Sequence, residues 1–231
     1  MINPAMLGVV AAGRRSSSDP SFGNVILLLH CDGADGSGTL TDSSSYNHTN
    51  FSSGPPNIET DDFMFGGASL YFPQTIGRVW YETTLTNLSG IDFCIEFWLK
   101  EETGSQGSVL SRRQASTAAG WSLTAASLRA KINGTWSDTQ MTWTRPSLNA
   151  WHHIAWTCSG TTMRIFVDGA IAATKTGVTS IEDVSIQSIV FGVGDDVNEF
   201  KLKGYIDEFR WTRGAARYTA DFTPAGPFPN S

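Results

Sequence analysis

Acidic side chains are the first groups to consider, because pairs of carboxyl groups hydrolyse glycosides. A retaining glycosidase needs two carboxyl groups about 5 Å apart, and residues two apart on a strand share a face of the sheet. This chain has no Glu-x-Asp-x-Glu run of the glucanase type, and Glu182-Asp183 and Asp207-Glu208 are adjacent pairs. Because adjacent strand residues point to opposite faces, this spacing argues against a glycosidase.

Histidines and cysteines offer no better reaction centre. His152-His153 could act as a base for a nucleophile, but the chain has no Gly-x-Ser-x-Gly motif that would supply one. The pattern therefore favours structural histidines. Cys31, Cys94 and Cys158 lack the Cys-x-x-Cys spacing of zinc and redox sites, and each lies in an apolar strand-like run. We therefore expect buried free thiols, which are typical of a reducing cytoplasm, and a protein that is not an enzyme.

Tryptophan is frequent, with eight residues in the chain. Trp136 and Trp143 lie in a polar stretch, and Trp80-Tyr81 lies beside Arg78. Exposed aromatic rings among hydroxyl and amide groups are suited to stacking on sugars, so these four aromatic residues are our candidates for carbohydrate binding. The alternative is that they anchor a protein neighbour, because tryptophan is also enriched at interfaces.

The elements that must position these side chains are strands. Residues 93–100 and 163–167 alternate between core and surface types, and Asp168-Gly169 is a strong hairpin signal. Residues 152–175 are thus predicted to form a three-strand meander. Further strands are predicted at 25–30, 68–72, 108–112, 121–124, 128–132, 188–193 and 203–211. About ten short strands indicate an all-β, antiparallel, two-sheet sandwich.

Composition narrows the possible partners. The chain has 231 residues, a net charge of −6 and 16% charged residues. Nucleic-acid binders are usually basic, so we expect no nucleic-acid partner. Because no apolar run reaches the roughly 18 residues of a membrane helix, we expect no membrane partner either. We divide the chain into an extended N-terminal arm (1–23), a domain (24–224) and a Pro-rich tail (225–231). The apolar patch at 6–12 precedes Arg14 and Arg15, the reverse of a secretory signal.

Several motifs, in order, resemble the laminin-G-like, concanavalin A-like jelly-roll family, especially the single-domain form found in bacteriophage structural proteins. The matching segments are 27–33, 42–44, 65–72, 92–98, 151–169 and 204–224. The resemblance covers about residues 25 to 224. It implies a jelly-roll sandwich, a fold that hosts both binding and catalysis.

The resemblance also implies calcium as a cofactor, since laminin-G-like folds often carry this ion. Asp32, Asp42 and Asp207 lie in the matching segments and are the predicted ligands. Asp32 would approach Asp207 if the first and last strands are neighbours. The alternative is that Asp207 pairs with Arg210 or Arg217, while Asp32 and Asp42 cap turns.

The function that this resemblance implies is structural. We expect a virion protein, assembled in the host cytoplasm as a homo-oligomer, that decorates a capsid or belongs to a tail. Its arm would bury apolar residues against other virion proteins, namely Ile2, Met6, Leu7, Val9 and Val10. The rival hypothesis is a carbohydrate-binding lectin that recognises host-surface glycans.

Overall fold

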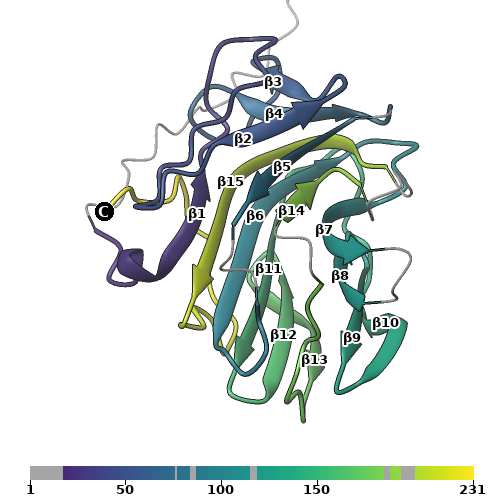
Figure 1. The fold of residues 1–231 in the computed structure, drawn as a ribbon. Coiled ribbons are helices and arrows are strands. Elements are labelled where there is room, and N and C mark those ends of the chain that lie inside the picture. The colour runs from purple at the N-terminus through teal and green to yellow at the C-terminus, as the bar shows by residue number, and fades with distance from the viewer. Residues whose placement is uncertain (1–17, 76, 84–86, 115–118, 185–187, 194–200) are drawn as a thin grey trace, which may run out of the picture.

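The computed structural model describes residues 18–231 except for 76, 84–86, 115–118, 185–187 and 194–200. The described chain contains one short 3₁₀ helix, η1 (Phe22–Asn24), and otherwise strands that form two antiparallel sheets (Figure 1). The predicted all-β, two-sheet antiparallel sandwich is therefore confirmed. In the described part, no helix is long and apolar enough to cross a membrane.

The first sheet, called sheet 1, contains the predicted meander and the last strand. Its order is β13 (Ala170–Lys175), β12 (Thr162–Val167), β11 (His152–Ser159), β6 (Phe93–Glu101), β15 (Lys203–Arg213), β4 (Ser69–Pro73) and β3 (Asn57–Glu59). β1 (Val25–Leu29) also pairs with β15, with Leu28 opposite Arg210. The first and last strands are therefore neighbours, as expected.

The second sheet, called sheet 2, is built from the middle of the chain. Its order is β10 (Thr135–Thr142), β9 (Ser127–Ile132), β8 (Ala119–Thr124), β7 (Ser108–Gln114), β14 (Ser188–Phe191), β5 (Arg78–Glu82) and β2 (Asn50–Ser53). The sequence pattern did not predict β2, β3, β5 or β10. β2 and β3 are short, and β10 is an edge strand whose side chains are mostly polar.

The predicted hairpin of the meander is present. Asp168 and Gly169 have φ angles of 51° and 82°, which suits a turn that needs two positive φ values. The Asp168 carboxylate also accepts a hydrogen bond from the His153 backbone N–H at 2.9 Å. The turn is therefore fixed both by its backbone and by its side chain.

The core lies between the two sheets. Trp121 of sheet 2 packs edge-on against Trp156 and Trp211 of sheet 1, with ring centroids 5.1 and 6.2 Å apart. All three indoles are at most 1% exposed. Strand alternation explains this inward set, because Trp156 and Trp211 pair with the inward Ile95 of β6.

Part of the outer face of sheet 1 is also buried, because the ends of the described chain cover it. Residues 18–24 and 214–231 lie over this face, and we call residues 214–231 the C-terminal strap. Phe228 packs on Val25 and Leu28, while Tyr218 and Phe222 pack against Phe166. The described part of the predicted arm and the predicted tail thus lie on the domain itself, and both meet on one side of the molecule (Figure 1).

Candidate functional site

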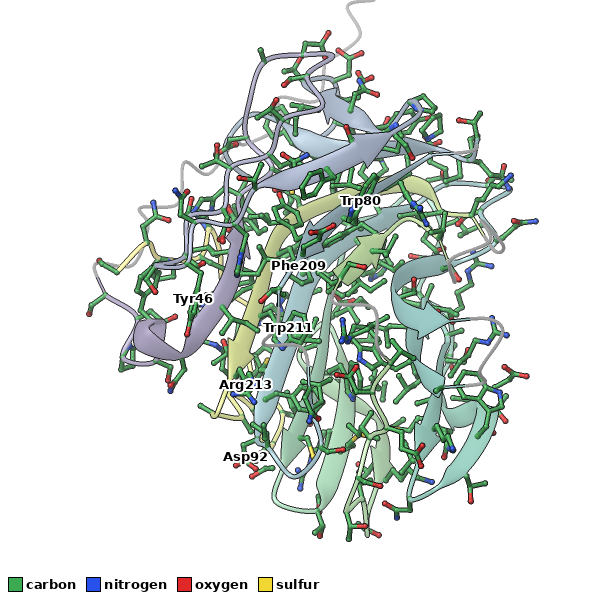
Figure 2. All side chains as sticks on the ribbon, in the orientation of Figure 1. Tyr46, Trp80, Asp92, Phe209, Trp211 and Arg213 are labelled. Atoms are coloured by element: carbon green, nitrogen blue, oxygen red, sulfur yellow. The ribbon has the colours of Figure 1, made fainter. Side chains whose placement is uncertain are left out.

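The outer face of sheet 2 carries an exposed aromatic platform. Val79 and Tyr81 point into the core and are 0% exposed, so Trp80 between them points outward. Phe51 lies opposite Trp80 on the neighbouring strand, and the two rings stack with centroids 5.6 Å apart. The Arg78 guanidinium lies 5.2 Å from the Trp80 ring. Figure 2 shows Trp80 in the part of the molecule where β2 and β5 lie.

We call Phe51, Trp80 and Arg78 the Phe51–Trp80 platform. Phe51 is 44% exposed, so a flat apolar surface faces solvent beside a cation that donates hydrogen bonds. Stacked aromatic rings next to such donors are suited to the apolar faces and hydroxyl groups of sugars. Phe51 was missed because its Ser-rich surroundings carry no strand alternation. An aromatic ring in such a polar stretch was itself the available signal.

Two of the four predicted sugar-binding aromatic residues are wrong, because they lie in the core. Tyr81 is 0% exposed and packs edge-on against Phe191. Trp143 is 9% exposed, and its indole N–H donates to the Ala125 carbonyl at 2.8 Å. For Tyr81 the physical reason is strand alternation, since neighbours on one strand cannot both face solvent.

Trp136 lies on the same outer face as Trp80, near the opposite edge of sheet 2. It pairs with Lys131 of β9 and is half-buried. Four strands separate β10 from β5, which corresponds to about 24 Å at the usual strand spacing. The two indoles therefore cannot contact a single sugar ring, although an extended polymer could reach both.

Hydroxyl groups lie between these two edges. The register row that begins at Trp80 passes through the apolar Val190 to Ser111 and Ser122, and Arg129 follows them. Both serine hydroxyls are buried and have no hydrogen-bond partner among the described residues. Arg129 donates to Asp138 at 2.9 Å, and Lys131 lies 2.8 Å from Glu182. Asp138 and Glu182 are thus each paired with a cation.

Of the three predicted calcium ligands, Asp32 and Asp207 lie together, and Asp42 lies apart from them. Asp207 is 0% exposed, and its Oδ2 accepts hydrogen bonds from the backbone N–H groups of Met64 and Phe65, each at 2.9 Å. A Cβ atom added to the next residue, Gly66, would lie 1.9 Å from Oδ1 of Asp32. One loop therefore contacts both acids and brings Asp32 and Asp207 together.

The second carboxylate oxygen of Asp207, Oδ1, indicates whether the site suits a cation. This Oδ1 is buried and has no hydrogen-bond partner in the part of the chain that the structure describes. Burial, and then the nearby carboxylates of Glu208 and Asp32, raise the pKa of Asp207 well above its usual value. Calcium prefers carboxylate and carbonyl oxygens, so an orphan carboxylate oxygen next to a second acid fits this ion. No group of three His, Cys, Asp or Glu side chains within the described ranges is arranged for a metal, so backbone oxygens would have to complete the set.

Asp42 does not fit the calcium prediction. Its carboxylate accepts hydrogen bonds from the backbone N–H groups of Leu28, Ser44 and His48 at 2.8–3.0 Å, and from the Ser44 hydroxyl. The alternative interpretation, that Asp42 caps a turn, is the correct one. For Asp207 the alternative is wrong, because its carboxylate accepts from backbone N–H groups, whereas Arg210 and Arg217 both bind Asp19.

Those two arginines belong to a charged cluster beneath the C-terminal strap. Arg210 donates to Glu96 at 2.7 and 2.9 Å and to Asp19 at 3.1 Å. Arg217 donates to Asp19 at 2.7 and 3.0 Å, and the Tyr218 hydroxyl donates to Glu96 at 2.9 Å. Every carboxylate oxygen in this cluster is engaged, so the geometry is that of a structural clamp.

Glu96 and His153 illustrate why this cluster is no reaction centre. His153 is fully buried, with Nε2 3.3 Å from Glu96. Burial alone would raise the pKa of Glu96, but Arg210, His153 and Arg217 outweigh it and lower the pKa to about 2. A carboxylate held this strongly in its charged form is a poor general acid or base near neutral pH.

The residues predicted to bind virion partners, Ile2, Met6, Leu7, Val9 and Val10, lie outside the described residues. The structure describes the chain from Ser18, and Asp19 is already bound to the domain through Arg210 and Arg217.

Solved structures show that this fold is shared with several binding domains. The binding domain of botulinum neurotoxin serotype D aligns with a TM-score of 0.62 and 13% identity, over 86% of this chain and 50% of that one. The binding domain of Paraclostridial Mosquitocidal Protein 1 gives 0.63 and 18%, over 85% and 50%. This chain thus spans about half the length of the two toxin domains.

Another similar structure is domain 4 of AbnA, an extracellular GH43 arabinanase from Geobacillus stearothermophilus, solved in complex with arabinotriose. It aligns with a TM-score of 0.62 and 15% identity, over 84% of this chain and 94% of that domain. No curated protein matches the sequence significantly. At these identities the structural likeness establishes the fold.

The family is established from the sequence. A family model of the laminin G type, described as the concanavalin A-like lectin/glucanases superfamily, matches residues 78–217. This match covers more than half of the chain and includes strands of both sheets. It agrees with the two-sheet sandwich and with the resemblance noted from the motifs. The chain therefore belongs to the concanavalin A-like lectin/glucanases superfamily.

Proposed function

We propose that the protein is a non-enzymatic carbohydrate-binding module that recognises glycans through the outer face of sheet 2. The observation that carries this proposal is the Phe51–Trp80 platform, in which the exposed Phe51 ring and the half-buried Trp80 ring stack beside the Arg78 guanidinium. The opposite face, on sheet 1, is covered in part by the ends of the described chain. Sheet 1 also carries a half-buried aromatic cluster of Tyr71, Trp151 and Tyr205, and the choice of sheet 2 rests on the greater exposure of Phe51, which is 44%.

Two further considerations support binding rather than hydrolysis. The acids of the cluster on sheet 1 are buried and bound to arginines, so they do not form an accessible pair around a glycoside. The similar arabinanase domain was solved with arabinotriose, which is a precedent for an oligosaccharide ligand on this fold. The two toxin structures are themselves described as binding domains.

A glycan array followed by affinity measurements tests the proposal. Wild-type protein is expected to bind a defined class of glycans, and Trp80→Ala to weaken binding at least tenfold, or about 1.4 kcal/mol. Trp136→Ala, at the other edge of the same face, is the matched control and is expected to keep most of the affinity. Unchanged binding by folded Trp80→Ala, or no glycan binding by the wild type, would contradict the proposal.

We further propose that calcium stabilises the domain by binding at Asp32 and Asp207. Calcium would supply positive charge to the orphan Oδ1 of Asp207 and reduce the repulsion between the two carboxylates. Calcium at a hundred times its Kd should stabilise the folded state by about 2.7 kcal/mol. The measurement is the melting temperature with calcium and with a chelator, for the wild type, Asp207→Asn and the exposed-acid control Asp61→Asn. If chelation leaves the wild-type melting temperature unchanged, the proposal is wrong.

The second candidate function is display on a virion, and it stays a prediction. The observation that favours a display role is the side on which the described chain begins, since Asp19 is bound on sheet 1, away from the aromatic platform. An arm attached to capsid or tail proteins would then leave sheet 2 facing outward. Deleting residues 1–17 keeps Asp19 and should abolish particle association. A particle that incorporates the shortened protein normally would refute attachment through the arm.

A further inference from the structure

A row of outward-facing side chains, three of them aromatic, crosses sheet 1 at the end of the molecule where β3 and β4 lie (Figure 1). Strand register aligns Asn57, Tyr71, Tyr205 and Lys100, and Trp151 follows at the start of β11. The ring centroids of Tyr71 and Trp151 lie 4.7 and 6.2 Å from that of Tyr205. We call these five residues the Tyr205 row.

The Tyr205 row lies outside the area that the C-terminal strap covers. The apolar contacts of the strap are made elsewhere on the sheet, at Val25, Leu28 and Phe166. All five members of the row are half-buried rather than buried, because strand alternation turns them away from the core. An accessible aromatic surface is therefore present on the sheet opposite to that of the Phe51–Trp80 platform.

The row already holds one cation of the protein itself. Asp62 accepts hydrogen bonds from the Trp151 indole N–H at 3.0 Å and from Lys100. The Lys100 ammonium also lies 5.7 Å from the centroid of the Tyr205 ring, within the range at which ring faces attract cations. Among the described residues, no cation lies over the rings of Tyr71 or Trp151. These two ring faces are thus available to a cation from outside.

The charge around the row is negative. Glu102 lies 3.5 Å from Lys203, whereas Glu59 accepts a hydrogen bond from the neutral Asn57 side chain at 2.7 Å. Together with the pair formed by Asp62 and Lys100, three carboxylates are set against two lysines. Burial, and then the charges nearby with Glu102 first, raise the pKa of Tyr205 to about 12, as expected where the surroundings disfavour a further negative charge.

The dimensions of the row suit an extended chain. Four strand spacings separate Asn57 from Trp151, or about 19 Å, which an extended peptide spans with about six residues. The row is one residue wide, because the next outward pair along β15 and β6, Asp207 and Trp98, is buried. Folded partners, including a second copy of this chain, usually need about 800 Å² on each side, which is more than such a strip offers.

We propose that the Tyr205 row binds an extended segment of a partner protein that carries arginine side chains. Arginine is the best match, because its planar guanidinium both stacks on aromatic rings and donates paired hydrogen bonds to a carboxylate. Glu59, whose partner Asn57 is neutral, is the carboxylate that would receive it beside Tyr71. This inference does not rest on glycan binding, since the two surfaces lie on different sheets.

A titration followed by nuclear magnetic resonance tests the proposal, with the Trp151 indole N–H as the reporter. The probe is a hexapeptide of alternating arginine and glycine, and its control is the same peptide with citrulline, which keeps the shape of arginine without its charge. The arginine peptide should bind saturably, and the citrulline peptide at least about tenfold more weakly. Binding of the arginine peptide should also weaken as salt is added.

Three variants locate the binding surface. Tyr205→Leu keeps an apolar side chain but removes the ring, and Glu59→Gln keeps an acceptor for Asn57 but removes the charge. Each should weaken binding of the arginine peptide at least about threefold, with thermal unfolding used to show that both variants are folded. Trp80→Ala is the control and should bind the peptide as the wild type does.

Four results would overturn the inference. The arginine peptide fails to bind, the citrulline peptide binds equally well, or the folded Tyr205→Leu and Glu59→Gln variants both bind undiminished. The fourth is loss of peptide binding in Trp80→Ala, which would place the peptide on sheet 2 instead. A failure of glycan binding alone would leave this inference standing.

Discussion

Glu96 shows how one buried side chain can be held charged and still be structural. Its carboxylate accepts from Arg210 and Tyr218 and lies beside His153, and it is 0% exposed. Sequence alternation correctly predicted that the strand around Glu96 has a core face formed by Phe93 and its alternate neighbours. It could not predict that Glu96 itself is covered, because the covering residues come from more than a hundred positions later.

The pKa of Glu96 predicts a pH dependence of stability. The pKa is about 2 in the folded state against 4.5 ordinarily, so the unfolded chain takes up a proton first as the pH falls. The stability due to Glu96 is full above pH 4.5 and is lost as the pH falls towards 2, by about 3 kcal/mol. Urea unfolding at several pH values should show this loss in the wild type. Glu96→Gln should lack it, and an equally steep profile would contradict the assignment.

The three cysteines should be unreactive in the folded protein. Burial raises the pKa of the Cys31 and Cys94 thiols well above the usual range, and raises that of Cys158 to about 11. The thiolate is the reactive form, so native protein at pH 8 should incorporate almost no iodoacetamide within the time that denatured protein takes to incorporate three equivalents. Rapid labelling of any one cysteine in the native state would show that its strand opens locally.

At the scale of elements, the C-terminal strap covers part of the outer face of sheet 1. The strap passes close to Gly169 in the β12–β13 turn, because a Cβ atom there would lie 1.9 Å from the Phe222 carbonyl oxygen. Phe222 in turn donates its backbone N–H to Gly169 at 2.9 Å. Gly169 is thus needed twice, because the turn requires a positive φ and the strap leaves no room for a Cβ atom.

Gly169→Ala should therefore destabilise the domain by more than the cost of its positive φ alone, which is about 1–2 kcal/mol. Gly177→Ala is the matched control, since Gly177 also has a positive φ of 72° but nothing within 4 Å of an added Cβ. Thermal unfolding should show a larger loss for Gly169→Ala. Equal losses for the two variants would mean that the strap is not bound there.

How far the sequence predicts these elements depends on whether the information is local. The meander from β11 to β13 is local: alternation and the Asp168-Gly169 turn specify it without help from the rest of the chain. β5 was missed because its inward and outward aromatic residues, Tyr81 and Trp80, look alike in composition. The burial of Trp143 likewise depends on a bond to Ala125, a contact that no spacing rule predicts.

At the scale of the whole molecule, Asp19 joins the two ends of the described chain. It binds Arg210 of β15 and Arg217 of the strap, and its backbone N–H donates to the Ser231 carbonyl at 2.6 Å. Removing one partner from a buried ion pair leaves the other charge unpaired, typically at a cost of about 3–5 kcal/mol.

Asp19→Ala should accordingly lower the free energy of unfolding by about 3 kcal/mol and expose the strap to limited proteolysis before the rest of the domain. The matched control is Asp35→Ala, which removes an exposed acid and should change the unfolding free energy by less than about 0.5 kcal/mol. If the strap of Asp19→Ala resists protease as well as that of the wild type, the clamp contributes less than its geometry indicates.

The hydrogen bond between Asp19 and Ser231 has a consequence for engineering. With these residues in contact, a linker of a few glycines and serines could connect them, and the chain could be reopened at an exposed turn such as Gly160-Thr161. A circular permutant of this kind would keep the strap in place while moving both new termini to the distal tips of the meander. Fused there to a surface, the domain would be presented in the reverse orientation, so that its former distal end becomes the attached one.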